Sequence, residues 1–158
     1  MRLVLIGAVL SVSCVILSCG KDEAPPRTEL TTAAKAELLQ RLRNQSGLSF
    51  DRSTELRYFH ENERAPGVEE WILFSTNNID FKSLPLDEKP LQMNDFNAPQ
   101  NVAGIIEHAT HEKVNGKIID LYAYYWSTAK REYHASALRT EKGTYVSLEV
   151  FPRKGRGT

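Results

Sequence analysis

The chain has 158 residues, of which 41% are hydrophobic and 25% charged, and its 20 basic side chains equal its 20 acidic ones. This length suffices for one domain with its own core, and this composition is typical of a globular chain rather than a disordered one. The balanced charge argues against general nucleic-acid binding, which needs a basic surface.

Residues 1–18 have the form of a signal peptide. Arg2 is followed by an uncharged apolar run from Leu3 to Leu17, which is shorter than the about 20 residues of a membrane-spanning helix. The run ends in the sequence Ile16-Leu17-Ser18-Cys19-Gly20. This ending resembles the lipobox of bacterial lipoproteins, in which an aliphatic and a small residue precede the lipidated cysteine. An ordinary secretory leader and an uncleaved anchor are the alternatives.

The resemblance implies that the leader is removed and that Cys19 carries lipid, including palmitate. The implied location is the bacterial cell envelope, at the periplasmic or surface face of the outer membrane. Residues 19–30 are then the lipidated cysteine and a polar tether, because Pro25-Pro26 and the surrounding charges disfavour a packed element. No cysteine follows Cys19 in the sequence, so the rest of the chain has neither a disulfide nor a cysteine metal ligand.

Residues 31–46 form the clearest predicted helix. Thr31 or Thr32 can cap its start, and Gly47 is placed to end it. Its apolar residues follow helical spacing: Ala34, Leu38, Leu39 and Leu42. We expect this amphipathic helix to lie on a sheet; a helix at the membrane surface is the alternative.

Two strands are predicted next, at 54–59 and 68–75, with a turn at 65–67. Residues 79–104 then read as a long irregular loop with three prolines and several apolar side chains. A free linker would not carry so many apolar groups. We expect the loop to fold onto the domain, where one place for it is over the aromatic face defined below.

Asn115-Gly116 predicts a type I′ turn between strands at 105–114 and 117–126. This register places His111 opposite Asp120 on one face of the hairpin. Residues three apart in a strand point to opposite faces, so His108 and His111 cannot share a metal ion. His111 and Asp120 are instead a candidate pair for general base catalysis, or a surface ion pair.

Glu141-Lys142-Gly143 predicts a three-residue hairpin loop that pairs Thr140 with Thr144. With the first hairpin, this completes a C-terminal four-strand meander. One predicted face is aliphatic and forms the core: Ile119, Leu121, Ala123, Leu138, Val146, Leu148 and Val150. The other, the aromatic face, combines rings with charges: Tyr122, Tyr124, Trp126, Tyr133, Tyr145, Glu107, His111, Asp120, Arg139 and Glu149.

The predicted fold class is therefore α+β: one N-terminal helix packed on an antiparallel sheet of about six strands, ending in the four-strand meander. Residues 31–152 form a single domain, and 153–158 are a basic tail. Leu121, Leu138 and Leu148 are expected to be buried on the side of the sheet that faces the helix.

The sequence contains no nucleotide-binding, catalytic or calcium-binding motif, so we predict a protein that is not an enzyme and needs no cofactor or metal. An exposed aromatic face of this size is typical of a binding surface. The predicted ligand-binding residues are Tyr122, Tyr124, Trp126, Tyr133, Arg139 and Tyr145, and the expected ligand is an envelope glycan or protein.

Three functions remain open. The first is a membrane-anchored binding module that uses the aromatic face. The second is a small hydrolase or lyase that uses His111 and Asp120, and the third is a purely structural envelope protein. A loop folded over the aromatic rings would turn that face into a second small core.

Overall fold

The computed structural model describes residues 30–61, 66–93, 95 and 97–153. The predicted signal peptide, the lipidated Cys19 and all of the tether except Leu30 lie outside these residues, as does the basic tail from residue 154 onward. The described part is an α+β structure with helices α1 (Thr32–Ser46) and α2 (Ala98–Thr110). It confirms the predicted fold class.

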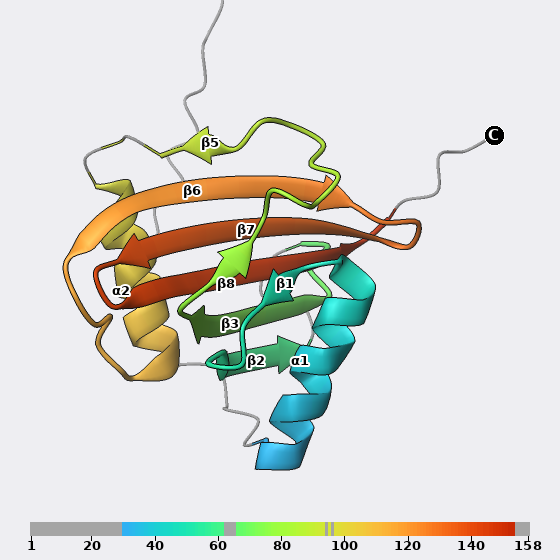
Figure 1. Ribbon diagram of the computed structural model, residues 1–158, viewed down its shortest axis with the longest axis horizontal. Coiled ribbons are helices and arrows are strands. Elements are labelled where there is room, and N and C mark those ends of the chain that lie inside the picture. Colours follow the sequence, from blue (N-terminus) through green and yellow to red (C-terminus); the bar gives the residue numbers. More distant parts are fainter. Residues whose placement is uncertain (1–29, 62–65, 94, 96, 154–158) are drawn as a thin grey trace, which may run out of the picture.

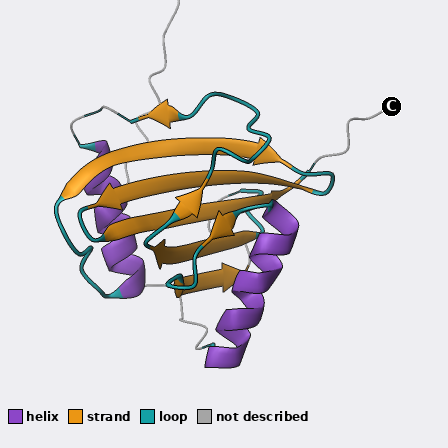
Figure 2. Ribbon diagram, in the orientation of Figure 1, coloured by secondary structure: helices purple, strands orange, loops and turns teal. Residues whose placement is uncertain are grey.

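A six-stranded antiparallel sheet forms the middle layer of the domain (Figure 1). From one edge to the other, its strands are β2 (Glu55–Glu61), β3 (Glu70–Thr76), β8 (Gly143–Pro152), β7 (Arg131–Thr140), β6 (Ile118–Ser127) and β5 (Leu91–Gln92). A separate two-stranded ribbon pairs β1 (Ser49–Phe50) with β4 (Ile79–Asp80). Helix α1 and the ribbon lie on one side of the sheet, the α1 face, and α2 lies on the other, the α2 face (Figures 1 and 2).

Helix α1 begins and ends where its sequence predicts. The Thr31 hydroxyl accepts a hydrogen bond from the Ala34 N–H at 3.2 Å, which caps the first turn. Gly47 adopts a left-handed conformation with φ of 77°, and its N–H donates to the Arg43 carbonyl at 3.1 Å. The buried leucines of the predicted stripe are Leu38 and Leu42.

The α1 face holds the larger core. Trp126 and Tyr133 are each only 1% exposed, and their rings stack with centroids 5.1 Å apart. The Trp126 Nε1–H donates to the Ser46 carbonyl at 2.8 Å, which ties the end of α1 to β6. Aliphatic and aromatic side chains surround this pair: Leu38, Leu42, Leu48, Phe50, Ile72, Phe74, Phe81, Val146, Leu148 and Val150.

The prediction of a strand at 105–114 is wrong, because residues 98–110 form helix α2. Pro99 fits in the first turn, where its missing N–H costs no helical hydrogen bond. The buried side chains recur at helical spacing: Ala103, Ile106, Ala109 and Thr110. Asn115-Gly116 therefore lies in the connection from α2 to β6 instead of in a hairpin, with Gly116 at φ of 86°.

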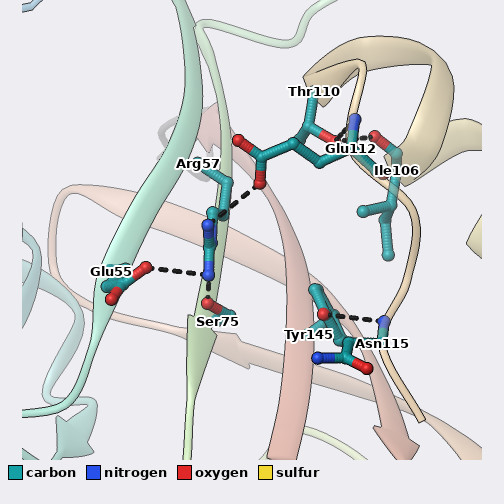
Figure 3. A network of polar contacts seen from close by, with 8 residues as sticks. All are labelled: Glu55, Arg57, Ser75, Ile106, Thr110, Glu112, Asn115 and Tyr145. Carbon is teal, nitrogen blue, oxygen red and sulfur yellow. Dashed lines mark hydrogen bonds and ion pairs between the residues drawn. The ribbon is translucent and has the colours of Figure 1, made fainter.

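Polar contacts hold the end of α2 against the sheet (Figure 3). The Arg57 guanidinium of β2 pairs with Glu112 at 2.9 Å and also donates to the Ser75 hydroxyl at 2.9 Å. The Tyr145 hydroxyl of β8 accepts a hydrogen bond from the Asn115 N–H at 2.9 Å. The connection that was predicted as a hairpin turn is thus fixed across the sheet by β2 and β8.

The predicted register of β8 is wrong by one residue. Thr140 pairs with Gly143, so the turn has two residues rather than three. The Thr140 hydroxyl accepts from the Lys142 N–H at 3.2 Å and donates to the Gly143 carbonyl at 3.0 Å, which stabilises this tighter turn. Leu138 therefore pairs with Tyr145, and each β8 side chain shares its face of the sheet with other β7 side chains than predicted.

The predicted core leucines are buried, but not on one side. Leu121, Leu138 and Leu148 are 2%, 0% and 0% exposed. Leu121 and Leu138 pack with α2, whereas Leu148 packs on the α1 face. Leu148 thus lies on the side that faces the predicted N-terminal helix, as expected, whereas Leu121 and Leu138 lie on the opposite side, because the shift of β8 separates their face from that of Leu148.

The two edges of the sheet are irregular. At one edge, β5 has only two residues. The chain before and after β5 follows β6 through single backbone hydrogen bonds, such as the one that the Asp87 N–H donates to the Tyr125 carbonyl at 2.9 Å. At the other edge, β2 has a bulge between Leu56 and Tyr58. Neither edge continues as a regular, straight strand.

Candidate functional site

The predicted ligand-binding rings do not share one face. Tyr122, Tyr124 and Trp126 lie on the α1 face with Tyr133, as their pairing across β6 and β7 requires. Tyr145 lies on the α2 face, because the shift of β8 pairs it with Leu138. The single face that carries all of these rings is therefore a wrong prediction.

Much of the predicted aromatic face is core. Trp126 and Tyr133 are buried under α1, and Phe81, from the segment after β4, stacks on Tyr124 with ring centroids 3.9 Å apart. Burial raises the pKa of Tyr124 above its usual value. The segment predicted as a loop at 79–104 thus covers part of this face, as the alternative prediction expected.

Arg139 is the exposed member of the predicted set. The Arg139 side chain is 58% exposed and forms a two-pronged ion pair with Asp120 across β6 and β7, with its Nε 3.0 Å from a carboxylate oxygen. The hydrogen bond and charge of Asp120 raise the pKa of Arg139. Tyr122 is half-buried beside this pair.

The predicted pairing of His111 with Asp120 is not formed. His111 ends α2 in a left-handed conformation with φ of 55°, whereas Asp120 lies in β6 and is paired with Arg139. The hairpin that would bring the two side chains together is replaced by α2. The general base arrangement expected for a hydrolase or lyase is therefore absent at this pair.

A pocket of about 330 Å³ opens on the α2 face, beside α2. We call it the His134 pocket. It is lined by residues of four neighbouring strands and of the helix: Trp71, Val102, Ile105, Tyr125, His134, Ala135, Ser136, Ser147 and Glu149. Helix α2 contributes apolar groups, and the strands contribute most of the polar ones.

The strand register aligns these side chains in two rows. Glu149 of β8 has two direct neighbours, Trp71 of β3 and His134 of β7, and His134 in turn neighbours Tyr125 of β6. In the next row, Ser147 is opposite Ser136. Directly opposite residues have Cβ atoms about 4.5–5.5 Å apart, so one small molecule can reach several of these groups.

Ring contacts and one hydrogen bond fix the walls of the His134 pocket. The Trp71 Nε1–H donates to the Ser147 hydroxyl at 2.9 Å. The His134 ring lies between Tyr125, at 4.9 Å between centroids, and Phe151, at 4.4 Å. These contacts position the imidazole between the two rings, and within the described residues it forms no side-chain hydrogen bond.

Among the described residues, Glu149 is the one acid that lines the His134 pocket. Glu149 is half-buried as a residue, its carboxylate has no hydrogen bond or ion pair within the described residues, and no lysine or arginine there lines the pocket. Half-buried carboxylates usually have a partner because desolvation of an isolated charge is costly. Glu149 is thus an acceptor available to a ligand.

The sequence predictions missed this pocket because of the register of β8. The three-residue loop placed His134 opposite Val150 on the aliphatic core face, and it placed Glu149 on the opposite face. Polar residues at every second position of β7 and of β8 were a sequence signal for the correct register. His134 and Ser136 in β7 match Glu149 and Ser147 in β8 when the turn has two residues.

This arrangement suits the binding of a small polar molecule with an apolar part. Hydroxyl, imidazole and carboxylate groups can hydrogen-bond a ligand, while aromatic and aliphatic walls pack against it. Among the described residues, no group of three or more His, Cys, Asp or Glu side chains could hold a metal ion. In the same part of the chain, neither helix has the length and apolarity required to span a bilayer.

Comparison of the chain with models of protein families, with curated proteins and with solved structures finds no match.

Proposed function

We propose that the protein is a lipid-anchored binding module of the bacterial cell envelope that captures a small ligand in the His134 pocket. One observation carries this proposal: polar and aromatic side chains from four adjacent strands converge on a single pocket beside α2. Convergent polar groups in a partly apolar pocket are typical of small-molecule sites.

The contacts inside the pocket favour binding over catalysis. Nucleophilic catalysis needs a hydroxyl within hydrogen-bonding reach of a base. Within the described residues, His134 forms no hydrogen bond with Ser136 or Ser147, and the hydrogen bond of the Ser147 hydroxyl is one that it accepts from the Trp71 Nε1–H. This supports a module without catalytic activity.

The lipid anchor rests on the leader, where Cys19 follows an uncharged apolar run and a small residue. We expect Cys19→Ser to abolish lipid labelling and to release or misprocess the protein. Mass spectrometry of the mature N-terminus checks this directly. An unmodified terminus, or cleavage elsewhere, would contradict lipidation and leave the pocket unaffected.

The two tryptophans of the chain provide a test of the pocket. Trp71 lines the His134 pocket, and Trp126 is buried on the α1 face, so their indole N–H signals in ¹H–¹⁵N spectra report separately on the two faces. We expect at least one probe from a set of butylammonium, 1-butanol, pentanoate and N-acetylglucosamine to shift the Trp71 signal and leave that of Trp126 unchanged.

A pair of variants separates specific binding from nonspecific effects. Ser136→Leu fills the pocket and should abolish the Trp71 shift, whereas Tyr122→Ala, on the opposite face, should preserve it. The pocket proposal fails if no probe shifts the Trp71 signal at millimolar concentration, or if Ser136→Leu leaves the shift intact.

A second binding surface is proposed at Tyr122 of β6 and the exposed Arg139 of β7. The supporting observation is the 58% exposure of the Arg139 side chain beside a half-buried ring. We expect a Tyr122→Ala/Arg139→Ala variant to lose retention on isolated envelope glycan if this surface binds it. Unchanged retention would exclude this surface.

A further inference from the structure

We infer that the ligand of the His134 pocket is an aliphatic primary amine, held by its ammonium group at Glu149. This inference rests on the proposed function, and it adds the chemical class of the ligand.

The charge of the pocket favours a cation. Glu149 contributes a carboxylate that has no partner within the described residues, and neither lysine nor arginine lines the pocket to offset it. An anionic ligand would meet this carboxylate, and a neutral ligand would leave its charge uncompensated. A cation pairs with it and also gains from the face of a nearby ring such as that of Tyr125.

The hydrogen-bonding groups favour a primary ammonium over a quaternary one. A primary ammonium has three N–H donors and therefore needs several acceptors. Glu149, Ser136 and Tyr125 line the pocket, and each of these side chains has an oxygen that can accept a hydrogen bond. A quaternary ammonium has no N–H and would leave these oxygens without hydrogen bonds.

The helix side of the pocket suits a hydrocarbon stem. Val102 and Ile105 of α2 line the pocket, and Ile105 is 42% exposed although it is a large apolar residue. A carbon chain lying against these two side chains would bury apolar surface while its ammonium reaches the strands. A free alkylamine and a lysine side chain share this chemistry.

The test compares three probes of similar size that differ in charge. Butylammonium, 1-butanol and pentanoate are titrated separately against the labelled protein, and the Trp71 indole signal is followed. We expect butylammonium to bind at least about tenfold more tightly than 1-butanol, because hydrogen bonds to charged groups are the stronger ones. Pentanoate should not shift the signal.

A matched pair of variants assigns the effect to Glu149. Glu149→Gln keeps the shape of the side chain and removes its charge, and it should weaken butylammonium binding by roughly tenfold or more. Glu141→Gln makes the same change in the exposed β7–β8 turn and should leave the affinity unchanged. Equal effects of the two variants would overturn the role of Glu149.

The outcomes separate this inference from the proposed function. If 1-butanol, pentanoate or N-acetylglucosamine shifts Trp71 more strongly than butylammonium, the amine is excluded and the binding pocket stands. If none of them shifts it, both proposals fail. A lysine-containing peptide that binds at least about tenfold more tightly than butylammonium identifies a lysine side chain as the source, and equal or weaker binding identifies a free amine.

Discussion

The two faces of the sheet each hold one tryptophan, and the two side chains are used differently. Trp126 is buried on the α1 face and donates its indole hydrogen to the Ser46 carbonyl at the end of α1. Trp71 is 3% exposed on the α2 face and donates to Ser147, a residue that also lines the His134 pocket. One indole joins two elements of the core, and the other forms a wall of a pocket.

The difference follows from how each face is covered. Helix α1, the β1–β4 ribbon and the segment around Phe81 together cover much of the α1 face. Among the described elements, helix α2 is the one that packs on the other face (Figure 1). The His134 pocket opens beside this helix. The less covered α2 face thus holds the pocket where Glu149 remains accessible to a ligand.

The largest effect is expected from truncation on the α1 face. Trp126→Ala should lower the free energy of unfolding by about 3–5 kcal/mol, because it leaves a large cavity and removes the hydrogen bond to Ser46. His134→Ala in the pocket should lower it by less than about 1 kcal/mol. Urea denaturation measures both, and equal losses would contradict the contrast between the two faces.

A polar network on the α1 face should also matter for stability. The Glu70 side chain is 8% exposed and pairs with Arg41 at 2.9 Å and Arg131 at 2.7 Å. Glu70→Gln should lower the free energy of unfolding by about 1–2 kcal/mol. This loss is smaller than that for a fully buried ion pair, because both arginines are partly exposed and can rehydrate. Glu69→Gln is the control, since Glu69 is 45% exposed and lies 4.0 Å from Arg131. A similar loss in both variants would show that burial does not decide the effect.

Strengthening α2 should stabilise its face by a smaller amount. A Cβ atom added at Gly104, inside α2, meets no atom within 4 Å. Gly104→Ala should therefore raise the free energy of unfolding by about 0.5–1 kcal/mol through better helix propensity. Gly116→Ala should do the opposite, because Gly116 has φ of 86° and its added Cβ would lie 2.9 Å from Lys142 Cγ. Thermal unfolding compares the two, and a loss at Gly104 would contradict a helix there.

The smallest effect concerns acid stability at the ribbon that covers the α1 face. A hydrogen bond from the Ser53 hydroxyl is the main cause that lowers the pKa of Asp51 below its usual 3.8, with help from Thr76. The charged form therefore stabilises the fold above pH 3.8, and this contribution is lost as the pH falls through the lowered pKa.

The variant Asp51→Asn isolates that contribution. Its melting temperature should lie slightly below that of the original chain at neutral pH, and the gap should close below pH 3.8. Melting curves between pH 7 and pH 2 measure the gap. A gap that widens toward acid pH would have the wrong sign for a lowered pKa.

Sequence patterns correctly predicted the helices and strands whose local sequence signals match the structure that they adopt in the folded domain. Helix α1 has its cap at Thr31 and its terminating Gly47, and both act as expected. The three strands β6, β7 and β8 carry β-branched and aromatic residues and were also predicted. Each signal is contained in a short segment, so it can be interpreted without knowledge of the rest of the fold.

The errors arose where two local patterns compete. The β-rich pair Ile105-Ile106, followed by the turn sequence Asn115-Gly116, favours a hairpin. Ala103, Ile106 and Ala109 instead recur at helical spacing, and they form the buried side of α2. At the β7–β8 turn, Gly143 accommodates a close approach that no short pattern reveals. Its added Cβ would lie 3.0 Å from the carbonyl oxygen of Thr76, a residue far away in the sequence.

The irregular edges of the sheet have a consequence for self-association. Chains join through β-structure when an outer strand presents a long, straight row of free backbone groups. Here the bulge at Leu56 and Tyr58 bends one edge, and Arg57 at that bulge is bound to Glu112. The other edge is the two-residue strand β5, preceded by Pro90. Neither edge offers a template for strand-by-strand growth into fibrils, so the sheet is built to stay at six strands even at high protein concentration.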